Sequence, residues 1–212
     1  MLHAIQTLKG FRCVAGDRRI GTIEDAYFDD RCWVVRYFVL GALGWLSDPR
    51  ALISTRTACD VDTINERIRA VPQFSDPFRY SGYPPPWTAL TLLATELGLV
   101  APPLEHPASA GEGKRMDGQN LRLCGEVIGL PVAARDGEIG RIEDVLFDDT
   151  RWMIRRLVVA TSSQRPGRRA LVPPACFEGI DWTGRVAVAM LTRSQIEASP
   201  PYDAAFRRAS LV

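Results

Sequence analysis

Along most of the chain, short stretches rich in apolar residues are separated by turn residues, without a long 3.6-residue period, which is typical of β-strands. The first half of the chain contains five such stretches, at Phe11–Ala15, Ile20–Phe28, Trp33–Leu40, Ala51–Ile53 and Arg67–Val71. The third is almost wholly apolar and rich in aromatic and β-branched residues, so we expect it to be buried on much of both faces. Five or six short strands separated by turn residues predict a small barrel or sandwich.

The same pattern recurs at a constant offset of 119 residues. Ile20–Val39 aligns with Ile139–Val158 without a gap, and eleven of the twenty paired positions are identical. Self-similarity of this extent indicates that a small domain has been duplicated. We predict a first domain over residues 1–80 and a second over residues 120–203, each large enough to build a core of its own.

Turns and one irregularity are repeated as well. Asp136-Gly137 is a strong hairpin signal between the first two strands of the second copy. The pairs Asp29-Asp30 and Asp148-Asp149 favour a second tight turn, because Asp tolerates turn geometry and can bond to nearby backbone groups. Between the two turns of the first copy, Ile23–Ala26 interrupts the alternation of sides, which predicts a β-bulge in the long strand.

Residues 81–119 form a connector of different composition. Trp87–Leu97 is apolar on nearly all sides and is followed by a glycine, a typical stop signal, so a helix is predicted there. Ala101–Gly118 is rich in Pro, Ala and Gly and predicts a flexible linker. A short helix is also predicted at Ser194–Ala198, and residues 204–212 are expected to form a C-terminal tail.

Longer motifs of the second copy resemble the PRC-barrel family, which is named for the cytoplasmic domain of the H subunit of the photosynthetic reaction centre. The matching segments are Asp136–Asp149, the apolar strand that begins at Trp152, Pro166–Pro174, Ile180–Trp182 and Leu191–Asp203. The first copy matches less completely, because Ser47–Ser54 replaces the Gly/Pro loop of the second. The resemblance implies a mainly β protein with two small PRC-type β-barrels in tandem, a helix and flexible linker between them and a short C-terminal helix.

The resemblance also carries an expectation about function. PRC-barrels look like adaptor modules that bind other proteins or cap a membrane complex, and a related barrel forms the C-terminal half of the bacterial ribosome maturation factor. A non-catalytic protein-binding or scaffolding module with an unknown protein partner is therefore expected. The alternatives are an RNA-processing or ribosome-assembly factor, a cation- or small-ligand-binding regulator, and a reaction-centre-associated protein.

Charge and cysteine content narrow the classes of partner and compartment. The formal net charge is +1, whereas a dedicated nucleic-acid-binding protein needs a basic patch or stripe, so nucleic acid is not the expected partner. The five cysteines are widely spaced and include no CxxC pair, which favours free thiols in a reducing compartment. Met1–Phe11 lacks the features of a signal peptide, and Trp87–Leu104 falls short of a membrane span, so we expect a cytoplasmic protein without a membrane span.

Four carboxylates at the predicted bulges, Glu24, Asp25, Glu143 and Asp144, are the first candidates for chemistry. One interpretation is a cation site or a proton relay. Adjacent strand residues point to opposite faces, however, so a doublet does not present both of its carboxylates to one ion. The other interpretation is that the doublets only mark the bulge.

Arg36 and Arg155 recur within the otherwise apolar strand. An Arg in such a strand must reach solvent or pair with a carboxylate, and the acidic doublets on the neighbouring strand are the expected partners. The alternative is that both guanidinium groups are exposed and bind a partner protein. Trp33 and Trp152, at the start of the same strand, are interpreted either as core aromatics or as interface anchors.

A basic cluster of the second copy, formed by Arg165, Arg168 and Arg169, lies in a Gly/Pro loop. It is either a solvated loop or a contact for an anion or an RNA phosphate. His3 and His106 are the only histidines, so no catalytic triad can be built, no Cys/His spacing suits zinc, and no Gly-rich phosphate loop occurs. We therefore expect no enzyme, no catalytic residue, no cofactor and no bound metal.

The duplication also suggests how the two domains are arranged. The matched strands Trp33–Leu40 and Trp152–Ala160 carry more apolar surface than a very small barrel interior requires. We expect them either to pack together about a pseudo-two-fold axis, as an intramolecular pseudo-dimer, or to form a homo-oligomer.

Overall fold

The computed structural model describes residues 1–41, 51–56, 58–70, 120–161 and 167–202. The first half of the chain contributes β1 (Leu2–Ala4), α1 (Ile5–Leu8), β2 (Arg12–Ala15), β3 (Arg18–Asp29), β4 (Val34–Gly41), β5 (Ala51–Ser54), β6 (Ala58–Asp62) and β7 (Arg67–Ala70). The second half contributes β8 (Leu121–Leu123), α3 (Cys124–Val127), β9 (Pro131–Ala134), β10 (Gly137–Asp148), β11 (Ile154–Thr161), β12 (Arg169–Val172), the 3-10 turn η2 (Pro174–Cys176), β13 (Phe177–Asp181), β14 (Val186–Ala189) and α4 (Arg193–Ala198). None of the described helices is long and apolar enough to span a membrane. The helix predicted at 87–97, the linker, the tail and Arg165 lie outside the described residues.

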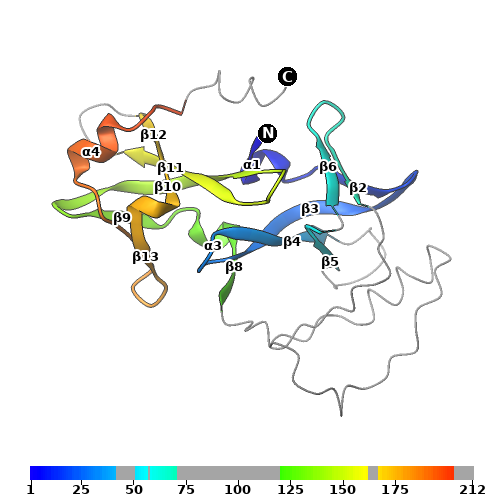
Figure 1. The fold of residues 1–212 in the computed structure, drawn as a ribbon, viewed down its shortest axis with the longest axis horizontal. Helices are drawn as coiled ribbons and strands as arrows, with labels where there is room; N and C mark the ends of the chain where they lie inside the picture. Colours follow the sequence, from blue (N-terminus) through cyan, green and yellow to red (C-terminus); the bar gives the residue numbers. More distant parts are fainter. Residues whose placement is uncertain (42–50, 57, 71–119, 162–166, 203–212) are drawn as a thin grey trace, which may run out of the picture.

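Each half contributes most of one seven-stranded, largely antiparallel sheet (Figure 1). The strand order is β5-β4-β3-β2-β7-β6 in the first sheet and β12-β11-β10-β9-β14-β13 in the second, so the two copies share one topology. Parallel pairing occurs between β2 and β7 and between β9 and β14. The mainly β prediction is confirmed, and α4 confirms the short C-terminal helix. The described strands leave both sheets open, so closed barrels are not shown.

The seventh strand of each sheet comes from the other half of the chain. β1 pairs with β10 in the second sheet, and β8 pairs with β3 in the first. The two pairings are equivalent at the offset of 119 residues, because Leu2 lies opposite Asp148 and Leu121 lies opposite Asp29. Figure 1 shows α1 beside the second sheet, and β8 and α3 beside β3 and β4. We call β1 with α1 the first arm, and β8 with α3 the second arm.

The predicted bulge is present in both copies and makes this exchange possible. The register of β3 against β4 shifts between Ile23 and Asp25, and that of β10 against β11 shifts between Ile142 and Asp144. Before the bulge β3 pairs with β2, and after it β3 pairs with the second arm. The extra residue bends the strand, so one end belongs to its own hairpin and the other end receives an exchanged strand.

One apolar core runs through both halves. Phe28, Phe38 and Phe147 are fully buried within it, and the first arm adds Ile5 and Leu8. A smaller cluster on the second sheet consists of Ala4, Leu146, Val158, Leu171 and Tyr202. Because both arms place side chains in a shared core, burial of apolar surface couples the stability of the two halves.

Gly140 precedes the bulge of β10 at a place without room for a side chain. A Cβ atom at this position would collide with the carbonyl group of Ala160 on β11. We expect Gly140→Ala to lower the free energy of unfolding by about 3 kcal/mol, since the close-packed backbone of β11 would have to move. Urea denaturation measures the loss.

The matched control for this prediction is Gly179→Ala in β13. Nothing lies within 4 Å of a Cβ atom built at Gly179. We therefore expect this variant to stay within about 0.5 kcal/mol of the wild type. Equal losses at the two glycines would contradict the steric argument.

Candidate functional site

The two halves meet where β4 and β11 begin. Val34 forms an antiparallel bridge with Met153, the residue at the same position of the other copy. Two backbone hydrogen bonds of 2.8 and 2.7 Å flank the bridge, and each runs from one half to a tryptophan carbonyl of the other. The strands thus follow the order β1-β10-β11-β4-β3-β8 across the junction, with equivalent contacts on its two sides.

Trp33 and Trp152 supply those carbonyls from a left-handed backbone conformation, with φ of 56° and 58°. This conformation is rare for a bulky residue and persists only where the surrounding structure holds it. Trp33 stacks on Phe28 with ring centroids 5.5 Å apart, and Trp152 stacks on Phe147 at 5.7 Å. Trp152 also meets Phe38 of the first half edge-on. Both tryptophans are therefore packing residues of the junction.

The inner carboxylates of the acidic doublets hold the arms. Asp25 accepts the Gly125 N–H of the second arm at 3.2 Å, and Asp144 accepts the Gln6 N–H of the first arm at 3.2 Å. Each carboxylate also accepts the N–H of the residue that follows it, at 2.8 Å. The first N–H groups of a helix have no partner within the helix. Each inner carboxylate therefore caps the short helix of the opposite arm.

The outer carboxylates lie on the other side of their strands, as the alternation of side chains requires. Glu143 accepts two hydrogen bonds from Arg169 of β12, at 2.5 and 2.6 Å, and these bonds raise the pKa of Arg169. Glu24 is exposed, and its side chain lies over Gly41 of β4. The four carboxylates are thus divided between two faces.

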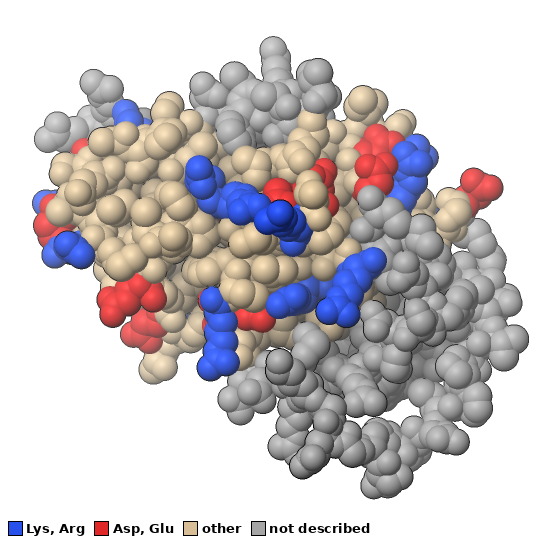
Figure 2. Space-filling model, viewed as in Figure 1, with Lys and Arg blue, Asp and Glu red and all other residues tan. Residues whose placement is uncertain are grey.

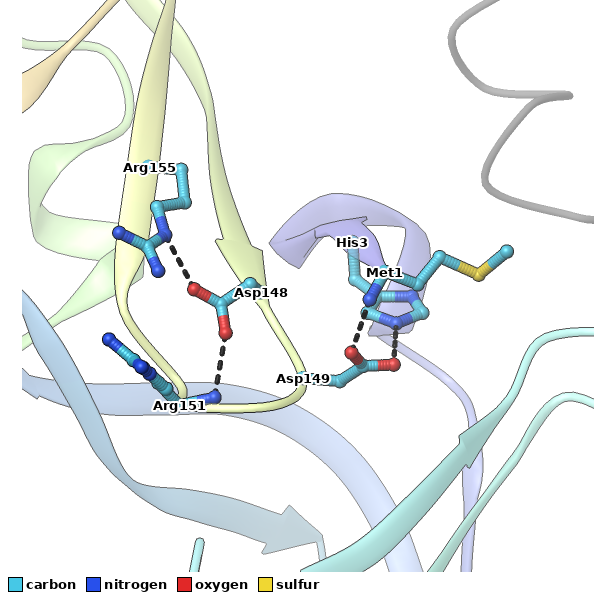
Figure 3. Close-up of polar contacts among 6 residues, drawn as sticks. All are labelled: Met1, His3, Asp148, Asp149, Arg151 and Arg155. Atoms are coloured by element: carbon cyan, nitrogen blue, oxygen red, sulfur yellow. Dashed lines mark hydrogen bonds and ion pairs between the residues drawn. The ribbon is translucent and has the colours of Figure 1, made fainter.

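Arg36 and Arg155 each pair with a carboxylate, which confirms the predicted ion pairs. The partners are the turn aspartates, so the expectation that the doublets Glu24-Asp25 and Glu143-Asp144 supply them is wrong. Arg155 Nε donates to Asp148 at 2.5 Å (Figure 3), and Arg36 Nη2 lies 3.4 Å from Asp29. The hairpin explains this choice, because Asp29 lies opposite Val34 and is a diagonal neighbour of Arg36 on the same face. Beyond the bulge, the inner carboxylates already face the arms.

The Asp29 carboxylate has a more polar environment than its partial burial suggests. Burial works to raise its pKa, but hydrogen bonds from the Cys32 thiol, the Arg31 N–H and Arg36 outweigh it and hold the pKa below its usual value. Arg36 also lies 3.4 Å from Cys32 Sγ. Asp29 therefore sets its turn, as the sequence predicts, and anchors the arginine of β4 as well.

The second aspartate of each turn contacts the opposite half, and here the two copies differ. Asp149 lies 2.5 Å from the N-terminal ammonium group and 2.8 Å from His3 Nε2 (Figure 3). Asp30 accepts the Trp182 indole N–H at 2.8 Å and lies 3.6 Å from Arg122. His3 and Arg122 are equivalent positions of the two arms, so each copy uses a basic group of the exchanged arm, with different chemistry.

The contacts of Asp149 include groups that shift the pKa of its carboxyl. Partial burial works to raise the pKa of Asp149, but the N-terminal ammonium group and His3 outweigh it and hold the pKa below the usual value. His3 is only 2% exposed and lies beside Phe147. At the other junction, Arg122 lies 4.5 Å from the centroid of the Trp182 ring, a cation–π contact in place of the histidine.

Cys124 at the start of α3 is fully buried. Burial raises the pKa of its thiol well above the usual value, and the charges of Asp25 and Asp144 raise it further. A thiol held in its neutral form is a packing group without nucleophilic character.

Arg168 and Arg169, the described members of the basic cluster, form contacts within the second half. Arg168 donates to the Glu197 carbonyl in α4, and Arg169 pairs with Glu143 on β10. Arg165 lies outside the described residues. The two described arginines thus connect β12 to a helix and to the long central strand.

The arms are the part of the site that sequence reasoning missed. The offset of 119 extends back to Leu2 and Leu121, and apolar residues at Ile5 and Leu8 recur as Cys124 and Val127. That pattern could have shown that each copy begins at its arm. It does not mark the sheet that the arm joins, because the receiving strands of both copies have the same apolar pattern.

Comparison with known protein families and curated proteins gave no match. No model of a protein family matches the chain, and no curated protein matches it with significance. Within the described part of the chain, no group of three or more His, Cys, Asp or Glu side chains lies close enough together to hold a metal ion. Function must therefore be inferred from the contacts themselves.

Removal of the Asp144 carboxylate takes a shared acceptor from two backbone N–H groups, those of Gln6 and Val145. We expect Asp144→Ala to lower the free energy of unfolding by about 3 kcal/mol and to loosen the first arm. Urea denaturation and hydrogen exchange at Gln6 measure these effects. Glu143→Ala is the matched control, because it removes an exposed ion pair worth less than about 1 kcal/mol. Equal losses in the two variants would contradict the capping role.

The lowered pKa of Asp149 predicts a pH-dependent contribution to stability. A carboxyl group with a lower pKa in the folded state stabilises the protein above its usual range and loses that effect as the pH falls through the folded-state value. We expect Asp149→Asn to be less stable than the wild type at about pH 7, and the difference to shrink below about pH 4. Urea denaturation over this range measures it. A difference that does not change with pH would contradict the prediction.

Proposed function

We propose that the chain is a two-repeat relative of the PRC-barrel proteins that acts as a non-catalytic, protein-binding scaffold in the cytoplasm. The main support is that the charged residues shared by the two copies make structural contacts within the chain. Asp25 and Asp144 cap the exchanged arms, and Arg36 and Arg155 anchor the hairpins. The two caps connect the halves and the two ion pairs brace each hairpin, and a chain braced in this way supports the proposal of a structural, protein-binding role.

The surface at the junction has a composition that suits a protein partner. The side chains of Arg36 and Arg155 remain 32% and 40% exposed, close to the half-buried Val34 and Met153. Arginine and methionine are enriched in protein interfaces. Figure 2 shows basic and acidic side chains intermixed on the face viewed. A mixed surface fits a protein partner better than the uniform negative charge of a nucleic acid backbone.

The contacts of the acidic doublets give less support to a cation-binding regulator. Asp25 and Asp144 already accept two backbone N–H groups each, and Glu143 is paired with Arg169. A cation at either doublet would have to replace these partners, at a cost comparable to the loss of a buried hydrogen bond.

Affinity capture from the native host, with the full chain as bait, tests the proposed function. We expect specific proteins to be retained after RNase treatment and in about 0.5 M salt, because apolar contacts are not screened by salt as charge contacts are. Mass spectrometry identifies them. Recovery of RNA or ribosomes alone, lost when the salt is raised, would overturn the proposal in favour of an RNA-processing factor.

A further inference from the structure

The two arms are capped in the same way. Gln6 of the first arm donates its N–H to Asp144 at 3.2 Å. Gly125, at the equivalent position of the second arm, donates its N–H to Asp25, also at 3.2 Å. Protonation makes a carboxylate a weaker acceptor, and it has this effect on both caps. The caps therefore do not distinguish one arm from the other in acid.

The basic side chain of each arm does distinguish them. His3 of β1 lies 2.8 Å from Asp149 (Figure 3). It is only 2% exposed and lies beside the Phe147 ring. The equivalent Arg122 of β8 keeps 35% of its side chain exposed and lies over the Trp182 ring. The first arm thus holds its basic group in the interior, whereas that of the second arm reaches solvent.

Asp149 is the carboxylate that faces His3 among the described residues. The N-terminal ammonium group is the other charged neighbour of Asp149 and is partly exposed. The remaining charged groups of the first arm, of β10 and of the bulges that hold the caps have other partners: Lys9 lies near Asp25, Asp148 pairs with Arg155, Glu143 pairs with Arg169, and Asp144 accepts the Gln6 N–H. The contact of His3 with Asp149 therefore determines how the first arm responds to acid.

Protonation of Asp149 changes this contact from favourable to unfavourable. Its pKa lies below the usual value, because the ammonium group and His3 outweigh the effect of partial burial. A carboxyl group of this kind stabilises the arm at neutral pH, and the effect is lost only as the pH falls below about 4. Histidine is charged in acid. A protonated Asp149 thus leaves a buried charge without a counter-charge, which is strongly unfavourable.

The second arm has no equivalent of this buried charge. Arg122 stays charged in acid, but its guanidinium group contacts solvent and the face of an indole ring. When Asp30 is protonated, its carbonyl oxygen can still accept the Trp182 N–H. The second arm therefore loses an ion pair in acid and keeps its other contacts.

We propose that the first arm is a latch that opens in acid while the second arm stays closed. Protonation of Asp149 removes the counter-charge of His3, and the arm leaves the second sheet so that the imidazolium group reaches water. The second sheet then loses its seventh strand, and Ile5 and Leu8 leave the shared core. The inference concerns a local opening of the chain and does not depend on the proposed protein-binding function.

Hydrogen exchange of the full chain, followed for single amides by NMR, tests the latch. The readout is the protection of the Gln6 amide divided by that of the Gly125 amide, because the effect of acid on the two equivalent caps cancels in this ratio. We expect the ratio to fall at least about tenfold between about pH 6 and about pH 3.5. A constant ratio, or loss of protection in the whole chain at once, would overturn the proposal.

Two variants test whether the buried charge is the cause. Asp149→Asn removes the counter-charge at every pH, so the arm should open as the histidine gains its proton, near about pH 6 and well above the wild-type range. His3→Gln keeps a donor for Asp149 without the charge, so the ratio should stay nearly constant down to about pH 3.5. If His3→Gln opens in the same pH range as the wild type, or Asp149→Asn opens at no higher pH, the latch is wrong.

Discussion

Each half of the chain depends on a helical turn that the other half supplies, and an aspartate at the bulge of a long strand caps that turn. The bulge bends β3 and β10 beyond their own hairpins, so that each can pair with the exchanged strand. It also places Asp25 and Asp144 where they meet the first free N–H groups of the arms. The two sheets are therefore completed together. Each sheet lacks its seventh strand until the other half supplies it. The contacts at the junction therefore stabilise both halves.

This dependence explains why the copies agree most closely around the junction. In a two-fold arrangement, the same contact is made once on each side of the junction, and each contact involves both copies. A change in either copy therefore disturbs the junction. The left-handed backbone at Trp33 and Trp152 recurs, and so does that at Glu66 and Arg185 in the β6–β7 and β13–β14 turns. Such conformations are unfavourable for these residue types and survive only where packing holds them. Their repetition shows that the duplicated unit keeps its backbone in detail as well as its strand order.

Local patterns predict the parts of this fold that local forces determine. Alternation of apolar residues and the turn aspartates give the long strands, and the break at Ile23–Ala26 gives the bulge, because each depends on neighbours in the chain. The exchange of the arms depends on which of two similar strand edges a short segment joins, and no local pattern distinguishes them. The partner of Arg36 was wrong for a related reason. Charge alone allowed either aspartate, and the choice follows from the hairpin register and from the capping task that already occupies Asp25.

Where the constraint of the junction ends, the copies diverge. Asp149 meets a histidine and an ammonium group, while the equivalent Asp30 meets an indole and an arginine. The outer edges of the sheets are freer still. The edge of β12 is paired with Pro200–Tyr202, and its row of apolar side chains is buried. The equivalent row on the first sheet has larger, half-buried side chains. Duplication thus supplies two copies of one sheet edge, and in the described part of the chain the second copy is paired with the chain's own residues.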